Sequence, residues 1–221
     1  MQALLLPIQK FVIQYKDLIN RLFQAAEAAL VVIWLTGTYL FTTSISWQLT
    51  IYELGKKAGV VALGLYLLSL VPGILSRTRW FPLVGTIIMP FRRHIGILMF
   101  LAALVHFNWT TSIFVFVLGV PPMFNWAQIA GLASLLILLP LWLTSNDPSK
   151  KFLGTKWKML HNLTHLAIFL IFTHLVLFQK NWMIPTALVV LLDVWSWIVF
   201  KKRQAQAPKV APAATTPPMT E

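Results

Sequence analysis

Long uncharged stretches alternate with short clusters of charge along this chain. A transmembrane helix needs about 20 mostly apolar residues. Three stretches between formal charges are long enough for one helix each: 28–52, 58–76 and 159–179. No Asp, Glu, Lys or Arg occurs between Arg93 and Asp147, which leaves room for two more helices, and residues 181–200 supply a sixth that one carboxylate interrupts. The pattern therefore predicts six transmembrane helices.

Both ends of the chain depart from this pattern. Between residues 8 and 24, apolar residues recur at helical spacing. This spacing indicates either an amphipathic helix on the inner surface of the membrane or a cytoplasmic extension of the first span. The stretch after Phe200 is basic and rich in Ala, Pro and Thr, which is typical of disorder. We expect an amphipathic segment at 1–25, a transmembrane domain at 26–200 and a disordered tail at 201–221.

The composition agrees with a membrane protein. Of the 221 residues, 58% are hydrophobic and only 11% are charged, and the mean hydropathy is +0.75. The chain has no cysteine, which excludes disulfides, iron–sulfur clusters, covalently attached c-type haem and a cysteine nucleophile. The predicted fold class is an all-α membrane protein, a bundle of six transmembrane helices.

The net charge of +12 could suggest a nucleic-acid partner, but the basic residues alternate with the predicted helices. Most of them precede helix one or follow helices two, four and six: Lys10, Lys16, Arg21; Arg77, Arg79, Arg92, Arg93; Lys150, Lys151, Lys156, Lys158; Lys201, Lys202, Arg203 and Lys209. The other connections hold only Lys56, Lys57 and Lys180. By the positive-inside rule, both termini are cytoplasmic and the chain is a multi-pass protein of the inner (plasma) membrane. The charge therefore favours contact with anionic lipid and not with nucleic acid.

All five histidines fall in two of the predicted helices. His94 and His106 lie in the third, and His161, His165 and His174 lie in the fifth. Both helices run outward from the cytoplasm, so their depths can be compared directly. His106 and His174 lie 12 and 13 residues beyond His94 and His161, or about 18–20 Å at about 1.5 Å per residue. The sequence therefore places two histidines at each of two matched depths.

Two imidazoles from facing helices can bind the iron of a b-type haem from both sides, without covalent attachment. Two such levels would form a redox path across the bilayer. The spacing predicts the depth of each histidine but not the direction of its side chain, because 13 residues leave two side chains roughly 140° apart around an ideal helix. His106 and His174 are the strongest candidate ligands, followed by His161 and His94. For His165, packing or hydrogen bonding is favoured.

Charged residues near these histidines suit the same chemistry. Haem propionates are anionic, and Arg92 and Arg93 lie at the inner level, although the positive-inside rule also accounts for them. Asp193 is an intramembrane carboxylate. It could accept a hydrogen bond from a ligand histidine, or pair with a basic side chain that reaches in from the membrane surface.

Two other functions stay open on these residues alone. A small membrane transporter could use the histidines to bind a divalent metal ion, which predicts histidines and carboxylates that converge at one depth. A structural subunit would use the histidines only for hydrogen bonds between helices.

Short motifs in this order resemble the ferric reductase-like transmembrane domain family, and within it the MsrQ type, the haem-binding subunit of the periplasmic methionine-sulfoxide reductase system. The matching residues, between about 55 and 180, are Arg92, Arg93, Gly96 and His106; Thr144, Ser145 and Asp147; Leu153, Gly154, Trp157, Leu160 and His161; and His174. The resemblance implies that His106, His161 and His174 are ligands of haem iron.

The same resemblance implies partners on both sides of the membrane. Electrons would come from a cytoplasmic flavin reductase and leave to an extracytoplasmic reductase subunit or another acceptor. Larger relatives carry a fused flavin and nicotinamide domain, whereas only 21 residues follow Phe200 here. We therefore expect one or two haems b, a possible flavin without a recognisable site, and an electron-transfer subunit of an oxidoreductase rather than a complete enzyme.

Overall fold

The computed structural model describes residues 2–178 and 181–206, and all regular secondary structure in these ranges is helical. Its elements are α1 (Gln2–Gln14), α2 (Lys16–Thr43), α3 (Ile45–Thr78), α4 (Pro82–Ile88), η1 (Met89–Phe91), α5 (Arg92–Phe116), α6 (Trp126–Leu143), α7 (Asp147–Leu153), α8 (Thr155–His161), α9 (Thr164–Leu177) and α10 (Met183–Gln206). Six segments of these ranges are long and apolar enough to cross a membrane: α2, α3, η1 with α5, α6, α8 with α9, and α10. The predicted all-α fold with six transmembrane helices is confirmed.

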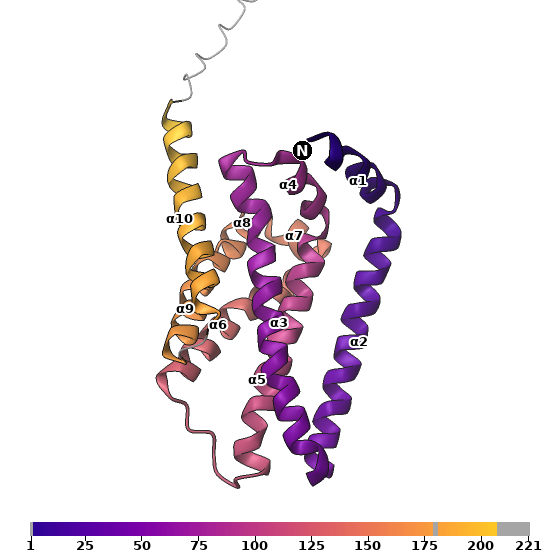
Figure 1. Cartoon of the computed structure of the whole chain (residues 1–221), viewed down its shortest axis with the longest axis vertical. Coiled ribbons are helices and arrows are strands. Elements are labelled where there is room, and N and C mark those ends of the chain that lie inside the picture. The colour runs from indigo at the N-terminus through magenta and orange to yellow at the C-terminus, as the bar shows by residue number, and fades with distance from the viewer. Residues whose placement is uncertain (1, 179–180, 207–221) are drawn as a thin grey trace, which may run out of the picture.

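The spans pack into one bundle, with α3 and α5 side by side at its centre (Figure 1). The helix α2 lies on one side of this pair and α10 on the other, while α6 pairs with α9. The main core joins α3, α5, α6 and α9, and its most deeply buried members are Tyr66, Leu70, Phe100, Leu138, Ala167 and Ile168. The beginning of the chain and the end of α10 lie at the same end of the bundle (Figure 1), as an even number of spans requires.

A second, smaller core attaches α2 to α3 and α5. Its centre is Trp109 of α5, whose ring packs with Phe41 and Ile51. The indole Nε1 donates a hydrogen bond to Thr38 Oγ1 at 3.2 Å. The ring also lies directly against Gly37, where a Cβ would come within 2.2 Å of Trp109 Cζ2. A small residue on α2 thus allows the close approach of two helices, as is common in membrane bundles.

The boundary between the first two spans differs from the prediction. The uncharged stretch 28–52 predicts one helix, but the chain turns at Ser44, which is extended (φ −139°, ψ 112°), so that residues 45–52 belong to α3. The charged residues expected in the connection lie within α3 instead. Glu53 and Lys56 pair across one turn of this helix at 2.5 Å, which is compatible with an unbroken helix. The prediction that this turn lies at the charged residues was therefore wrong.

The N-terminal segment also differs from a single predicted helix over 8–24. It is divided at Tyr15, so that α1 is a separate helix packed against α4, and α2 begins at Lys16 and continues into the first span. The extension of the first span is confirmed for α2, and the location of α1 on the inner surface of the membrane stays a prediction.

Part of the predicted tail, 201–221, is helical. Residues 201–206 continue α10, because Arg203 Nη1 donates hydrogen bonds to the carbonyl oxygens at the end of α3. Residues 207–221 lie outside the described ranges.

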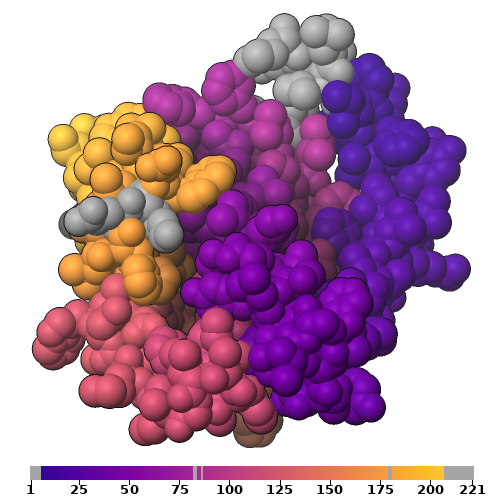
Figure 2. Space-filling view, turned by 60° about the horizontal axis from the view of Figure 1, so that its bottom comes forward, coloured from indigo at the N-terminus to yellow at the C-terminus, as the bar shows by residue number. Residues whose placement is uncertain are grey.

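The opposite end of the bundle exposes apolar side chains. Figure 2 shows this end, where the beginning of α3 lies near the connection between α5 and α6. The most exposed apolar side chains there are Ile45, Met123 and Trp126. Such a surface suits the membrane interface or contact with another protein.

Replacing Gly37 by alanine should weaken the contact between α2 and α5. The added Cβ would lie 2.2 Å from Trp109, so the indole must move, at a cost of about 1–3 kcal/mol. Thermal unfolding in detergent, followed by circular dichroism, should show a lower Tm. Gly64→Ala is the control, because a Cβ at Gly64 meets no atom within 4 Å. Equal Tm values for the two variants would contradict the packing of Trp109.

Candidate functional site

Two imidazoles meet inside the bundle, one from α5 and one from α9. The ring centroids of His106 and His174 lie 6.4 Å apart, and their planes are inclined at 81°. Both side chains are half-buried. These are the two histidines predicted at the outer of the two depths, and the structure brings them together.

Each ring is held by one backbone carbonyl. His106 Nδ1 lies 2.9 Å from the carbonyl oxygen of Gly55 on α3, and His174 Nδ1 lies 2.7 Å from that of Ala127 on α6. Because a carbonyl oxygen only accepts, both Nδ1 atoms carry the proton and donate it. In the neutral ring, Nε2 then keeps its lone pair, and no residue in the described ranges forms a hydrogen bond with either Nε2. This tautomer leaves Nε2 free to bind a metal, with the other ring N–H donated to a carbonyl as is common for metal-binding histidines.

A glycine stands against each ring, four residues after the residue whose carbonyl accepts. A Cβ at Gly59 would lie 2.8 Å from His106 Nδ1, and a Cβ at Gly131 would lie 2.7 Å from His174 Nδ1. In a helix, residue i+4 lies one turn beyond residue i on the same face. A side chain at that position would cover the carbonyl oxygen, so glycine leaves it open to the imidazole.

Sequence reasoning missed these two glycines. A signal for them exists, because Gly55 and Gly59 on one helix, and Ala127 and Gly131 on another, repeat a small residue at a spacing of four. This spacing is typical of helices that approach closely in membranes.

The two histidines predicted at the inner depth turn to different neighbours. His94 Nδ1 donates a hydrogen bond to Glu27 Oε1 of α2 at 2.8 Å, and its ring stacks on Phe23. His161 Nε2 lies 3.2 Å from Thr144 Oγ1, and its ring stacks on Trp157 with centroids 3.9 Å apart. The structure therefore places His94 in the contact between α2 and α5, and His161 beside the end of α6.

A break in the fifth span contributes to this arrangement. The helix α8 ends at His161, and α9 begins at Thr164. In between, the N–H of Asn162 is shared between two carbonyls of α8, and His165 and Leu166 bond three residues back. The 13 residues from His161 to His174 are thus not one ideal helix, and the angle expected from their spacing does not apply.

The two arginines at the start of α5 have different surroundings. Arg93 donates to the carbonyl oxygen of Ser145 at 2.7 Å and to Asp147 Oδ1 at 3.0 Å, which ties α5 to the turn between α6 and α7. Arg92 is half-buried, and no hydrogen bond or ion pair joins it to another residue that the structure describes. Of the two guanidinium groups, that of Arg92 is the one available to an anion.

Comparison with known families decides what kind of bundle this is. A family model described as "Ferric reductase like transmembrane component" matches residues 58–173, more than half of the chain. The chain belongs to this family. The matched region contains four of the five histidines and ends one residue before the fifth, His174, and this ferric reductase-like chain is a multi-pass membrane protein.

Curated relatives carry a more specific name. Proteins named "Protein-methionine-sulfoxide reductase heme-binding subunit MsrQ" from Brucella melitensis biotype 2, Brucella ovis and Brucella canis are each 33% identical over 144 residues. The match covers 60% of this chain and 64% of each relative, so the chain spans less than two thirds of their length. No solved structure matches the chain. The predicted resemblance to the MsrQ type of the ferric reductase-like family is confirmed.

This ferric reductase-like bundle also holds a buried charged network next to α9. Asp193 of α10, which is only 4% exposed, forms an ion pair with Arg77 of α3 and accepts a hydrogen bond from His165 Nδ1 at 2.6 Å. Arg77 Nε also donates to Ser196 Oγ at 2.8 Å, and its guanidinium lies over the Trp197 ring. The predicted pairing of Asp193 with a basic side chain is confirmed. Asp193 also accepts a hydrogen bond from a histidine, but that histidine is His165 and not one of the candidate ligands.

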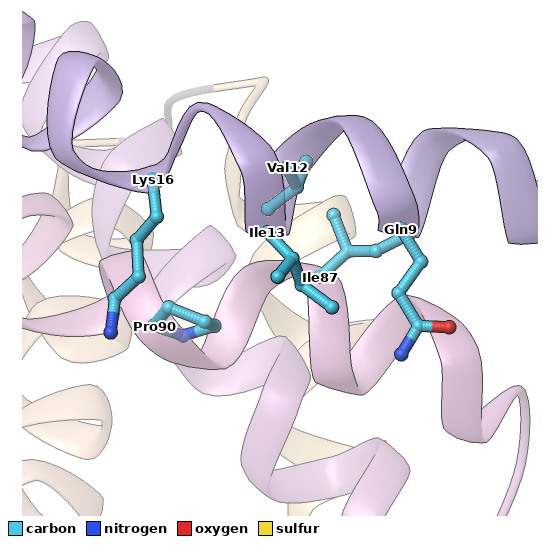
Figure 3. Close-up of a pocket in the computed structure, with 6 residues that line it drawn as sticks. All are labelled: Gln9, Val12, Ile13, Lys16, Ile87 and Pro90. Atoms are coloured by element: carbon cyan, nitrogen blue, oxygen red, sulfur yellow. The ribbon is translucent and has the colours of Figure 1, made fainter.

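A separate pocket of about 230 Å³ lies between α1 and the segment of α4 and η1 (Figure 3). Its lining consists of Gln9, Val12, Ile13, Lys16, Ile87 and Pro90. No histidine contributes to it, so it is distinct from the facing imidazoles.

Breaking the network at Asp193 should destabilise this ferric reductase-like fold. Asp193→Asn leaves the Arg77 charge inside the bundle without its counter-ion, a change that costs about 3–5 kcal/mol in buried ion pairs. The Tm in detergent should fall clearly, and the double variant Arg77→Met/Asp193→Leu should recover much of the loss because both charges are removed. Glu53→Gln, which breaks an exposed pair, is the control and should change the Tm little. A Tm for Asp193→Asn equal to that of the control would contradict the network.

Proposed function

We propose that this ferric reductase-like protein is a b-type haem-binding subunit that carries electrons across the inner membrane. The single observation that carries the proposal is the facing pair of His106 and His174. The printed name of the relatives, a heme-binding subunit of a methionine-sulfoxide reductase, supports it.

The spacing of the two rings fits one iron between them. An imidazole nitrogen binds a metal at about 2 Å, and the ring centre lies roughly 1 Å behind that nitrogen, so two rings on opposite sides of one iron have centroids about 6 Å apart. The observed separation is 6.4 Å. A haem bound there would supply a one-electron ferric/ferrous couple.

The chain's own groups prepare this pair for binding iron. The carbonyls of Gly55 and Ala127 hold the proton on Nδ1, which fixes the tautomer and makes Nε2 a stronger donor to a metal. Gly59 and Gly131 let each ring sit close against a neighbouring helix. The ring of Phe178 lies edge-on against His174 with centroids 5.0 Å apart, so part of the surroundings is apolar.

We assign a second, inner haem to His161, with Arg92 as the partner of its propionates. The Thr144 hydroxyl beside His161 Nε2 is a neutral group, which a metal can displace. His94 is hydrogen-bonded to Glu27, and Arg93 forms an ion pair with Asp147. We therefore assign His94 and Arg93 to contacts between helices and not to haem binding.

The direction of transfer follows from the proposed topology. We place the end of the bundle that carries α1, α7 and the end of α10 in the cytoplasm, because the lysines gather there. A cytoplasmic flavin reductase would reduce the inner haem, and an extracytoplasmic reductase subunit or another acceptor would oxidise the outer one. A metal transporter is less well supported, because the described ranges contain no group of three or more His, Asp or Glu that could hold an ion.

A dithionite-reduced minus air-oxidised absorbance spectrum tests the cofactor. The purified protein should show b-type bands, and His106→Ala and His174→Ala should each remove the same component because both side chains bind one iron. His94→Gln should keep that component. A flat spectrum from folded protein expressed with sufficient haem, or loss of different components in the two alanine variants, would contradict the proposal.

The glycine positions give a second test that leaves the ligands in place. Gly59→Ala and Gly131→Ala push a methyl group into the imidazole, and a disturbed partner of a metal-binding histidine weakens binding by about 10-fold or more. Haem per protein, measured by the pyridine haemochrome method, should fall in both variants. Gly64→Ala, with open space around its Cβ, should match the wild type. Full haem content in Gly131→Ala would show that the ring of His174 does not need this position.

A further inference from the structure

The connection between α6 and α9 exposes a basic and apolar surface at the end of the bundle that carries α1. Phe152 is 90% exposed and Met159 is 71% exposed. Four exposed lysines stand beside them in α7 and α8, namely Lys150, Lys151, Lys156 and Lys158. We call Phe152 and these four lysines the α7–α8 platform.

The charge of this platform is not balanced by its neighbours. Asp147 is the carboxylate at the start of α7, and it pairs with Arg93 at 3.0 Å. None of the four lysines forms an ion pair within the ranges that the structure describes. The platform therefore presents four unopposed positive charges around one exposed aromatic ring, which is complementary to an acidic surface.

Trp157 connects this platform to the interior. Lys150 Nζ lies 5.7 Å from the centroid of the indole ring. The ring stacks on His161 with centroids 3.9 Å apart and planes inclined at 26°. Its Nε1 donates to the carbonyl oxygen of Thr144 at 3.0 Å, which fixes the ring in place. A continuous aromatic contact thus leads from the exposed lysines to the inner histidine.

We propose that the α7–α8 platform is the docking surface for a soluble electron-donor protein with an acidic face, and that its electrons reach the bundle at the stack of Trp157 and His161. This inference rests on the proposed function. In each transfer, a reduced flavin in the donor would lose one electron to a haem held by His161, whose iron would change from ferric to ferrous, and any proton from the flavin would go to water. No covalent bond forms between the two proteins.

A lipid surface is the competing occupant, because anionic headgroups also attract lysines. The order of residues favours a protein. Lysines stand both before and after Phe152, so charge flanks the exposed ring on both sides, which opposes its insertion into hydrocarbon. Lipid binding would also not require the contact with His161 that the Trp157 ring provides.

The absence of cysteine allows a direct test of lipid against water. Phe152→Cys would carry the only thiol in the chain, and bimane attached to it can be studied in nanodiscs that contain anionic lipid. We expect quenching by aqueous iodide and little quenching by doxyl-labelled lipid. The opposite pattern would place residue 152 in the bilayer and overturn the proposal.

Docking is tested with flavodoxin, an acidic flavoprotein that transfers single electrons. One variant reverses the platform lysines (Lys150→Glu, Lys151→Glu, Lys156→Glu, Lys158→Glu). The control reverses four other exposed lysines near the same end (Lys10→Glu, Lys16→Glu, Lys201→Glu, Lys202→Glu), so the change in net charge is equal. Reduction of the haem by flavodoxin hydroquinone, followed by stopped-flow absorbance at low salt, should be about 10-fold or more slower in the platform variant than in the control. Equal rates in the two variants, or no reduction of the wild type, would overturn the proposal.

Two measurements separate this proposal from the proposed function. Binding of oxidised flavodoxin, detected by microscale thermophoresis, requires no electron transfer and should be lost only in the platform variant. The dithionite difference spectrum reports the haem in every variant without a docked protein. A flat spectrum with intact binding would refute the haem, whereas a normal spectrum with unchanged binding in the platform variant would refute the docking surface.

Discussion

One hydrogen bond, made twice, fixes the geometry inside this bundle. It joins an imidazole Nδ1 to a backbone carbonyl that already accepts the bond of its own helix, and it uses the second lone pair of that oxygen. Such a carbonyl can be reached only where no side chain covers it, so Gly59 and Gly131 are required by the same contact. The packing of α3 on α5 and of α6 on α9 follows from it, because each pair must approach closely enough to seat a ring.

Most charged groups within the hydrocarbon region have a partner. Asp193 is neutralised by Arg77 and bonded to His165, and His94 is bonded to Glu27. The other histidines use neutral partners, a carbonyl or a hydroxyl. In a medium where an unpaired charge is costly, this separation leaves the facing pair of His106 and His174 electrically neutral, while most lysines stay at the ends of the helices.

Much of this architecture could be predicted from the sequence, because the length of an apolar run and the depth of a residue depend only on counting. Six spans and the matched depth of His106 and His174 belong to this class. The directions in which the helices turn and the side chains face could not be predicted. The turn at Ser44 carries no charge, the break after His161 changes the angle along the fifth span, and His94 faces α2 because Glu27 is there. Each depends on a partner distant in sequence or on a local bend that apolar periodicity does not record.

The two half-sites also have a consequence for symmetry. The helices α3 and α6 run in one direction and α5 and α9 in the other (Figure 1), and each antiparallel pair supplies one carbonyl, one glycine and one histidine. The two pairs therefore repeat one unit in the same chain order, a helix that supplies the carbonyl and the glycine followed by a helix that supplies the histidine. Neither pair holds both histidines, since each supplies only one. A group bound between the rings would join the two halves as a metal joins two subunits, so its binding would favour the assembled bundle over the separated pairs.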